Sequence, residues 1–382
     1  MSSIRPIIKW PGGKSAELPF IRPVLGDVPG RYFEPFLGGG AVLLGLPADR
    51  QAYASDASVS LVGVYEGLKT QDHDFMSSVL SLGLTRCRLC ELDGLEEWRR
   101  DYAGVPDLLD GLHDPELSAL VLPAILKASG IKERWMARMG VEPVASIFET
   151  AIQAGFYNAV RQQMNDLPEG PQQSACFWFV REYAYGGMFK TTKAGRECVA
   201  YGGASYNRRQ FTDRITQAMA PDMQARLSAT TFHACDFEDL LTEYAAGAGD
   251  TVFLDPPYDR GFSTYDRNAF TADDHRRLAD WIGRTKSRCV LVVASTEQSE
   301  AIYGNIPGSE VMRFGLRYRQ GIKGRFNQQA THLMVVRPGE DMGPIAGMTA
   351  GELPDTDKKT TTTKPASVPA AEPLMEEMRH VA

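Results

Sequence analysis

The sequence contains no long apolar stretch, and none of its 382 residues falls in a run of about eighteen apolar side chains. No membrane-spanning helix is therefore expected. The segment Met1–Pro6 is not followed by the apolar core of a secretory signal. Cysteine is scarce, with six residues in the whole chain, which argues against a disulfide framework and favours a reducing compartment. These absences predict a cytoplasmic protein without membrane contact.

Metal-ligand patterns are equally sparse. Cys87 and Cys90 form a single CxxC pair, whereas a structural zinc site generally needs a second pair. The other cysteines show no such spacing, and they are Cys176, Cys198, Cys235 and Cys289. We therefore expect no metal.

Positive charge is in short supply overall, because the formal net charge is −7. The acidic excess is concentrated in residues 70–150 and in the segment from 339 onward, and the rest of the chain is slightly basic. Two stretches are locally basic. Residues 181–214 carry seven basic and three acidic side chains, and residues 303–329 include Arg313, Arg317, Arg319, Lys323 and Arg325 against Glu310. Such clusters suit phosphate contacts, although a solvated charged face explains either one equally well.

The apolar pattern alternates between short β-rich runs and helical periodicity. The expected strands are residues 31–36, 51–56, 230–236, 251–254, 289–294 and 330–336. The expected helices between them are residues 59–69, 211–225 and 270–286. This alternation predicts an α/β fold with a mostly parallel, doubly wound, Rossmann-like sheet. Ligands bind outside the carboxyl ends of the strands in such sheets.

Residues 72–170 interrupt this rhythm and are rich in helix formers, with helices expected over residues 108–112, 117–127 and 144–164. We predict that they form an inserted, mainly helical domain. The parent domain then comprises residues 1–71 and 171–338. Residues 339–382 are rich in Pro, Thr and charged side chains, which predicts a disordered tail.

Two features at predicted strand ends suit cofactor binding. The loop Glu34-Pro35-Phe36-Leu37-Gly38-Gly39-Gly40 joins a strand to an expected helix start at residues 41–44, and its glycines would let the backbone approach a ligand. A purely structural turn explains the loop equally well. Asp56 ends the next strand, where an acid commonly binds ribose hydroxyls. A helix N-cap is the alternative role for Asp56.

Two further segments fit the same cofactor. The stretch Lys9-Trp10-Pro11-Gly12-Gly13-Lys14-Ser15 is not a Walker motif, because Ile8 occupies the position of the first glycine. It offers an aromatic ring, a tight turn and a lysine, which could stack a purine and pair with a carboxylate. The pair Asp236-Phe237 closes a strand and could bind adenine, although Phe237 is equally well explained as a core residue.

The most specific motif is Asp255-Pro256-Pro257-Tyr258, which follows the buried strand 251–254. The lone pair of an aromatic exocyclic amine is delocalised into the ring, so an enzyme must orient it. The Asp255 carboxylate and the Pro256 carbonyl can each accept one N–H, and the two prolines stiffen the loop. Tyr258 can stack on an extruded base, which is worth about 1–3 kcal/mol. The motif thus predicts chemistry on an exocyclic amine.

Together these motifs resemble the Dam-type family of DNA adenine-N6 methyltransferases, over most of residues 5–338 except the helical insertion. Residues 9–14 resemble the family's KWxGGK motif, residues 34–40 its EPFxGxG loop, and the motif order is its α-type arrangement. The resemblance implies S-adenosylmethionine as cofactor, no metal, and double-stranded DNA as substrate. It also implies a bacterial or phage-encoded, nucleoid-associated enzyme that is monomeric in solution and needs no protein partner. The implied cofactor residues are Trp10, Pro11, Lys14, Glu34, Phe36, Gly38, Gly40, Asp56, Asp236 and Phe237.

DNA contacts are also implied by the resemblance. The stretch Tyr183–Thr191 resembles the family's recognition hairpin, but Gly186 and Lys190 replace the usual Asn and Arg, and Ala200 replaces a Pro. Lysine cannot repeat a bidentate arginine contact, so the family's GATC site is not transferred to this chain. The expected DNA-binding residues are Tyr185, Met188, Lys190, Arg317, Arg319, Lys323 and Arg325.

Three alternatives to adenine-N6 methylation remain at this point. The first is cytosine-N4 methylation, which also acts on an exocyclic amine. The second is a catalytically idle DNA-binding regulator that keeps the cofactor fold. The third is a methyltransferase for RNA or small molecules.

Overall fold

The computed structural model describes residues 4–90, 114–140, 145–203, 207, 209–257, 270–320 and 326–340. The chain divides into two compact units. One contains Gly12–Ser58 and the described residues from Ala225 onward, and the other contains Ile7–Pro11 and the described part of Val59–Gln224. The predicted functional domains at 1–71, 72–170, 171–338 and 339–382 stay predictions.

The first unit is built on a seven-stranded sheet with the order β3-β2-β1-β4-β5-β7-β6. The strands are β1 (Tyr32–Glu34), β2 (Ala52–Ser55), β3 (Thr230–His233), β4 (Thr251–Leu254), β5 (Arg288–Ala294), β6 (Glu310–Gln320) and β7 (Phe326–Arg337). The first five pair in parallel, and β7 joins β5 and β6 by antiparallel pairing. This arrangement confirms the predicted Rossmann-like α/β fold. The strand order reverses between β1 and β4, which is where such sheets bind ligands.

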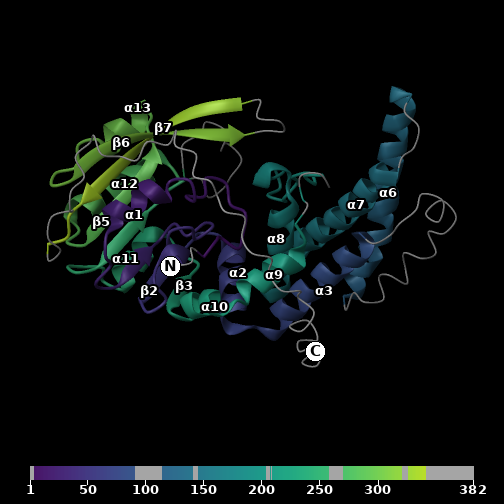
Figure 1. Cartoon of the computed structure of the whole chain (residues 1–382), viewed down its shortest axis with the longest axis horizontal. Helices are drawn as coiled ribbons and strands as arrows, with labels where there is room; N and C mark the ends of the chain where they lie inside the picture. Colours follow the sequence, from purple (N-terminus) through teal and green to yellow (C-terminus); the bar gives the residue numbers. More distant parts are fainter. Residues whose placement is uncertain are drawn as a thin grey trace. The chain divides into compact units, whose positions relative to one another are not determined.

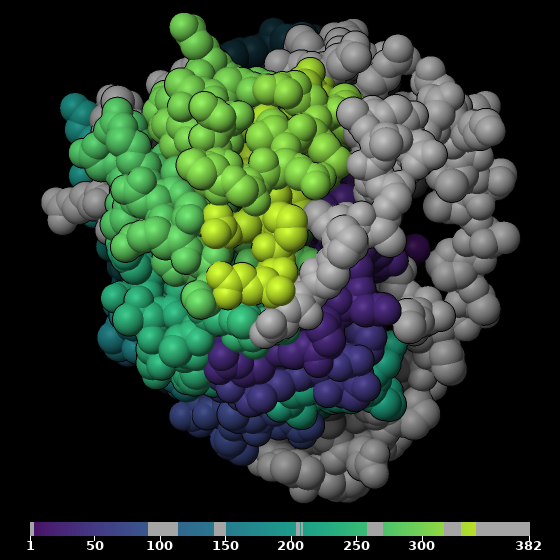
Figure 2. Space-filling model, turned by 90° about the vertical axis from the view of Figure 1, so that its left-hand side faces the viewer, coloured from purple at the N-terminus to yellow at the C-terminus, as the bar shows by residue number. Residues whose placement is uncertain are grey.

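Helices cover the sheet of the first unit (Figure 1). They are α1 (Leu18–Leu25), α11 (Phe237–Glu243), α12 (Ala272–Arg284) and α13 (Glu297–Tyr303). Alternate residues along the strands share one face, and Phe33, Val252, Leu254 and Leu291 pack there with apolar residues of α11, α12 and α13. The N-terminal segment lies against the C-terminal strands (Figure 2). The buried rings of Phe20 and Phe314 stack there, with centroids 4.5 Å apart.

The second unit is helical. It contains α2 (Val59–Thr70), α3 (His73–Cys90), α6 (Pro115–Met139), α7 (Ala145–Asp166), α8 (Pro171–Tyr183) and α9 (Phe211–Ala218). Its core includes Trp178, Phe75, Phe179 and Phe211, all of which are at most 1% exposed. In chain order these helices fall between β2 and β3. None of the helices in the described ranges is long and apolar enough to cross a bilayer.

Three expected elements differ from the structure. Residues 211–225 form two helices, α9 and α10 (Pro221–Ser228), because Pro221 lacks an N–H and disfavours helical geometry at the residue before it. The expected helix at 41–44 is only one 3-10 turn, Leu43–Gly45, since Leu46 precedes Pro47 and is extended. The helix expected at 117–127 extends over Pro115–Met139 and stops at Gly140, which is left-handed. The helix expected at 108–112 lies outside the described residues.

Candidate active site

The carboxyl edge of the sheet gathers the predicted strand-end motifs of the first unit. The glycine loop follows β1, Asp56 follows β2, Asp236 lies three residues beyond β3, and Asp255 follows β4. Backbone bonds join these ends: Leu37 N–H donates to Ser55 at 2.8 Å, and Asp56 N–H donates to His233 at 3.2 Å. Because β1 pairs with both β2 and β4, the glycine loop and Asp255 flank the switch point. This edge is our candidate site.

Asp255 is paired with a buried lysine. The Lys14 ammonium lies 2.6 Å from Asp255 Oδ1, and the Lys14 side chain is only 3% exposed while that of Asp255 is 20% exposed. Lys14 also donates to the Gly12 carbonyl at 2.9 Å, which places it in the turn before α1. Burial raises the pKa of Asp255 to about 6, against the opposing effect of Lys14. The pair therefore holds an ionised carboxylate at neutral pH.

The loop around Asp255 is described as far as Pro257. Pro256 is buried and Pro257 is exposed. Tyr258, the last residue of the motif, lies outside the described residues, so its stacking role stays a prediction.

Asp56 ties the glycine loop to the second strand end. Its Oδ2 accepts from the Gly38 N–H and its Oδ1 from the Ser58 N–H, both at 3.0 Å. A carboxylate has about four acceptor positions, so a ligand diol could still bind to both oxygens. Gly38 and Gly40 have φ angles of 47° and 63°, a region that favours glycine and brings backbone N–H groups toward this edge.

Glu34 is buried, whereas a residue that contacts a ligand has to be accessible to it. It is 2% exposed, and its Oε2 accepts from the Tyr32 hydroxyl at 2.7 Å. Burial raises its pKa to about 8, against hydrogen bonds from Tyr32 and from the backbone of Leu43. Glu34 thus holds the turn after the glycine loop as a neutral acid, and its predicted contact with the cofactor stays a prediction.

Glu34→Gln is expected to stabilise the protein at alkaline pH. The unfolded chain releases the Glu34 proton near pH 4.5, whereas the folded protein keeps it up to about pH 8. The free energy of unfolding therefore decreases as the pH rises from about 4.5 to about 8. Gln stays neutral throughout. The melting temperature of the variant relative to wild type should therefore rise between pH 6 and pH 8.5, by at least about 2 °C. A difference between variant and wild type that is independent of pH in thermal scans would contradict the protonated state of Glu34.

Phe237 and Asp236 lie at the end of β3. The Phe237 ring is 1% exposed and packs against Phe36 and Phe270, with centroids 5.6 and 6.0 Å away. The ring is therefore part of the core, the alternative that its sequence position left open. The Asp236 carboxylate caps α11 through the Glu238 N–H at 3.0 Å and is bound by Arg277, a residue that the motifs did not indicate.

Trp10 and Pro11 belong to the second unit. The Trp10 ring meets Phe189 edge-on, with centroids 4.8 Å apart, and lies 6.4 Å from Phe177. Trp10 therefore contacts the predicted recognition hairpin within this unit, while Pro11 is exposed. Their predicted contact with the cofactor stays a prediction.

The predicted recognition hairpin is an ordered turn in the second unit. Its two arms meet where the Cys198 N–H donates to Lys190 and the Thr192 N–H donates to Arg196, at 2.7 and 2.8 Å. Tyr185, Met188 and Phe189 expose 48%, 49% and 43% of their surface. Lys190 is also exposed. The hairpin thus exposes a large apolar surface, which suits contact with a partner molecule.

Several arginines of the basic stretch 181–214 form contacts within the second unit. Arg181 is fully buried, donates to the Met188 carbonyl at 2.9 Å and lies 3.6 Å from the Phe189 ring centroid. Arg214 pairs with Glu182 at 2.9 Å, and Arg196 with Asp166 at 2.6 Å. Arg181 is therefore not one of the phosphate contacts that this basic stretch suits, because its cation faces the interior.

The second basic stretch is only partly described. Arg313 is engaged by Glu300, with Arg313 Nε 2.9 Å from Glu300 Oε1. Arg317 and Arg319 lie in β6, but their side chains are outside the described part of the structure, as are Lys323 and Arg325. Their DNA contacts stay predictions.

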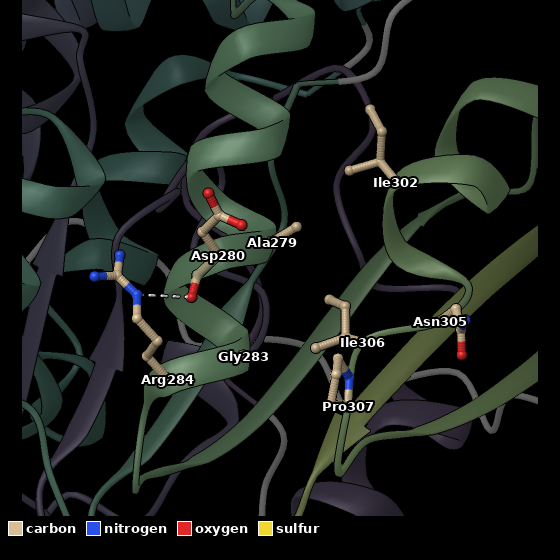
Figure 3. A pocket seen from close by; sticks show the side chains of 8 residues that line it. All are labelled: Ala279, Asp280, Gly283, Arg284, Ile302, Asn305, Ile306 and Pro307. Carbon is tan, nitrogen blue, oxygen red and sulfur yellow. Dashed lines mark hydrogen bonds between the residues drawn. The ribbon is translucent and has the colours of Figure 1, made fainter.

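Among the described residues, each unit contains a cavity. One of about 600 Å³ lies between α12 and α13 and is lined by Arg284, Ile302, Ile306 and Pro307 among others (Figure 3). The end of α12 precedes β5, so this cavity is at the amino edge of the sheet, opposite Asp255. The other, of about 520 Å³, lies within the second unit between the hairpin and α6 and α7. It is lined by Lys132, Arg161 and Tyr185 among others, and no carboxylate is among its described lining residues.

No group of three or more His, Cys, Asp or Glu side chains that could hold a metal occurs in the described residues. The strand ends instead offer carboxylate oxygens, which can accept hydrogen bonds from a diol and from an amine. A Rossmann-like sheet with an Asp-Pro-Pro loop beside its switch point is the arrangement that the sequence motifs predict for a methyltransferase of exocyclic amines.

The family assignment follows from comparison with known proteins. The family model described as "D12 class N6 adenine-specific DNA methyltransferase" matches residues 10–86 and 140–313. The chain belongs to this family of DNA methyltransferases.

The relatives are distant, and two of the three described here extend over most of the chain. The type II methyltransferase M.CviBI of Paramecium bursaria Chlorella virus NC1A is 22% identical over 87% of this chain and 99% of its own length. The DNA adenine methylase of Vibrio cholerae is 22% identical over 78% of this chain and 83% of its own. The Retron Ec67 DNA adenine methylase of Escherichia coli is 28% identical over 41% of this chain and 53% of its own.

Proposed function

We propose that this protein transfers a methyl group from S-adenosylmethionine to the N6 amino group of an adenine that is flipped out of duplex DNA. The observation that carries this proposal is the Asp255–Lys14 pair at the carboxyl end of β4, next to the glycine loop of β1. It places an ionised acceptor where a doubly wound sheet binds its ligands. Family membership supports adenine as the base.

The strand ends suit the cofactor. Asp56 would accept the ribose hydroxyls, and the backbone of the Gly38–Gly40 turn would face the rest of the cofactor. Asp236 would accept the adenine amine. S-adenosylmethionine, when bound, supplies an electrophilic methyl group on a sulfonium, which is already a good leaving group.

Asp255 would act by orientation. Its Oδ1 is held by Lys14, which leaves Oδ2 to accept one N–H of the target amine, and the Pro256 carbonyl would accept the other. The nitrogen lone pair then points away from both acceptors, toward the methyl donor. Pro257 has no N–H that could compete for these acceptors. Tyr258 would stack on the extruded base, which offsets the cost of flipping.

The hairpin of the second unit would contact DNA. Tyr185, Met188 and Lys190 are exposed on it, and the adjoining cavity is lined by the cations Lys132 and Arg161. We expect Arg317, Arg319, Lys323 and Arg325 to add contacts, and a monomer to act on one duplex site.

Transfer of a labelled methyl group tests the proposal directly. Purified protein is incubated with tritiated S-adenosylmethionine and either unmethylated genomic DNA or total RNA. We expect label in DNA, none above background in RNA, and none with Asp255→Ala. Label in RNA alone would favour an RNA methyltransferase. Sequence-selective DNA binding without any transfer by wild type would favour the idle regulator.

Lys190→Ala is expected to relax sequence preference. The loss of one direct base contact costs about 1–3 kcal/mol of discrimination at one base pair. Sequencing of methylated positions in a randomised duplex library should therefore show one position of the recognised site become degenerate. The control is Lys286→Ala in the first unit, where the ammonium pairs with Glu340 at 3.2 Å, and its recognised site should not change. If the Lys190 variant keeps the wild-type site at every position, Lys190 does not read a base.

A further inference from the structure

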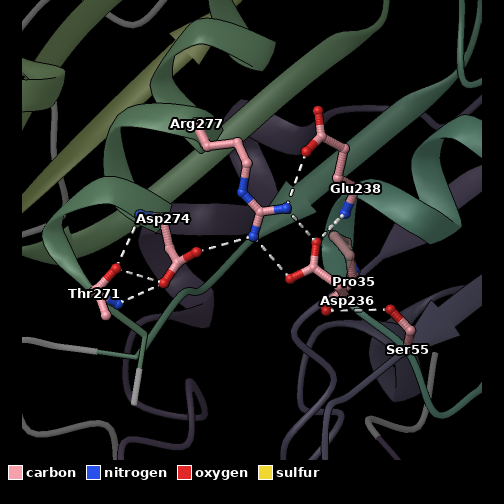
Figure 4. A network of polar contacts seen from close by, with 7 residues as sticks. All are labelled: Pro35, Ser55, Asp236, Glu238, Thr271, Asp274 and Arg277. Carbon is pink, nitrogen blue, oxygen red and sulfur yellow. Dashed lines mark hydrogen bonds and ion pairs between the residues drawn. The ribbon is translucent and has the colours of Figure 1, made fainter. Parts of the chain in front are cut away.

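Arg277 is the centre of a polar network at the end of β3 (Figure 4). From α12, its guanidinium binds Asp236 through two hydrogen bonds, Nη1 to Oδ1 at 2.8 Å and Nη2 to Oδ2 at 3.0 Å. It also binds Glu238 and Asp274, each at 3.0 Å. One cation thus holds three carboxylates, and the bidentate geometry fixes the plane of the Asp236 carboxylate.

The network is anchored at both ends. Asp274 is held by Thr271, whose N–H and hydroxyl donate to its Oδ2 at 2.8 and 2.7 Å in the capping box of α12. On the other side, Asp236 caps α11. Arg277 therefore links the start of one helix to the start of another, and the position of Asp236 depends on it.

The network is only half-buried. The side chains of Arg277 and Asp236 are 37% and 38% exposed, so both are accessible from solvent. The guanidinium also lies 4.6 Å from the Phe237 ring centroid, so it covers a ring that is otherwise buried in the core. A purine entering here would meet Arg277 and Asp236 before it met Phe237.

The remaining acceptor capacity of Asp236 can be counted. A carboxylate has about four acceptor positions. Within the described part of the chain, Oδ1 takes the Glu238 N–H and Arg277 Nη1, while Oδ2 takes Arg277 Nη2. One position on Oδ2 is left, and it lies on an exposed side chain in a fixed plane.

We propose that Arg277 is a positioning residue for the cofactor purine, and that it directs the last acceptor position of Asp236 at the exocyclic 6-amino group. This inference rests on the proposed function, because it takes S-adenosylmethionine as the cofactor. It adds a residue that selects a 6-amino purine over a 6-oxo purine. Arg277 acts on the purine by fixing the position of Asp236, and it takes no part in methyl transfer.

Binding of two product analogues tests the assignment without any turnover. Isothermal titration measures the Kd of S-adenosylhomocysteine and of S-inosylhomocysteine, in which a 6-oxo group replaces the 6-amino group. Wild type should prefer the adenosyl compound by at least about 10-fold, because the 6-oxo group offers Asp236 no hydrogen. Arg277→Gln should reduce this preference to within about 3-fold, while the Kd of S-inosylhomocysteine changes less than about 3-fold. Arg277→Lys should lie in between, since lysine lacks the planar fork.

The neighbouring arginine provides a matched control. Arg276 is on the same helix and pairs with Asp273 at the surface, so Arg276→Gln should keep the wild-type preference. If Arg277→Gln weakens both compounds equally, or keeps the full preference, Arg277 does not position Asp236 and the inference is overturned. If wild type binds neither compound, both the proposed function and the inference about Arg277 are overturned. If wild type methylates DNA but shows no 6-amino preference, only the inference fails.

Discussion

Asp255→Asn is expected to lower the single-turnover rate of DNA methylation by about 100- to 1000-fold, the usual effect of removing one preorganised electrostatic contact. Asn keeps the shape of the side chain but replaces one acceptor oxygen with an amide NH2, which is a hydrogen-bond donor. That group would face either Lys14 or the target amine, and both are hydrogen-bond donors. The affinity for S-adenosylhomocysteine should change little, because Asp255 orients the base and not the cofactor.

The rate is measured as tritium transferred to DNA with enzyme in excess, so that product release does not contribute. Asp280→Asn is the matched control, since Asp280 is an exposed carboxylate on α12 that lines the cavity at the opposite edge of the sheet. Its rate should equal that of wild type. A wild-type rate for Asp255→Asn would remove Asp255 from the chemistry.

Lys14→Met is expected to shift the pH profile of methylation to higher pH. Burial raises the pKa of Asp255 to about 6, and Lys14 opposes that rise. Without the ammonium, the pKa of Asp255 moves further up, because burial is no longer compensated. A shift of one pH unit lowers the ionised fraction of Asp255 at pH 6 from about one half to about one eleventh, so the single-turnover rate there should fall by about 5-fold or more. The variant should regain rate as the pH is raised toward 9.

The sign of the wild-type profile follows from the same residue. As pH falls through about 6, Asp255 gains a proton and loses acceptor capacity, so the rate should fall on the acidic side. Single-turnover rates between pH 5 and pH 9 for wild type and Lys14→Met give both curves. A loss in the variant that is equal at every pH would show that Lys14 acts on folding or cofactor binding rather than on the ionisation of Asp255. Removing one partner of a buried pair also costs about 3–5 kcal/mol, so the melting temperature is measured in parallel.

Six of the seven strands could be predicted because each contains a short apolar run, and several of these runs end at an acid or a glycine-rich turn. The parallel core β1 to β5 follows that pattern, and its order places the motifs at one edge. β6 could not be predicted in the same way. Its sequence Glu310–Gln320 alternates apolar and basic residues, and this pattern also fits a charged cluster. α8 was missed because its residues are buried around the whole circumference, so it shows no polar face.

The positions of Asp255 and Asp56 at strand ends could be predicted from the sequence, and their roles stay predictions. Roles that depend on a partner far along the chain could not be predicted. Arg277 lies 41 positions from Asp236, and only the packing of α12 beside α11 joins them. The sequence likewise shows Arg181 as one basic residue among seven, although the fold buries it beneath Phe189.

The most direct test of the central claim is the modified nucleoside itself. DNA from methylation-deficient cells that express either wild type or Asp255→Asn is digested to nucleosides and measured by mass spectrometry. The account predicts N6-methyladenine with wild type, a reduction of about 100-fold or more with Asp255→Asn, and no N4-methylcytosine in either. N4-methylcytosine in place of N6-methyladenine, or N6-methyladenine at equal levels with both proteins, would contradict it.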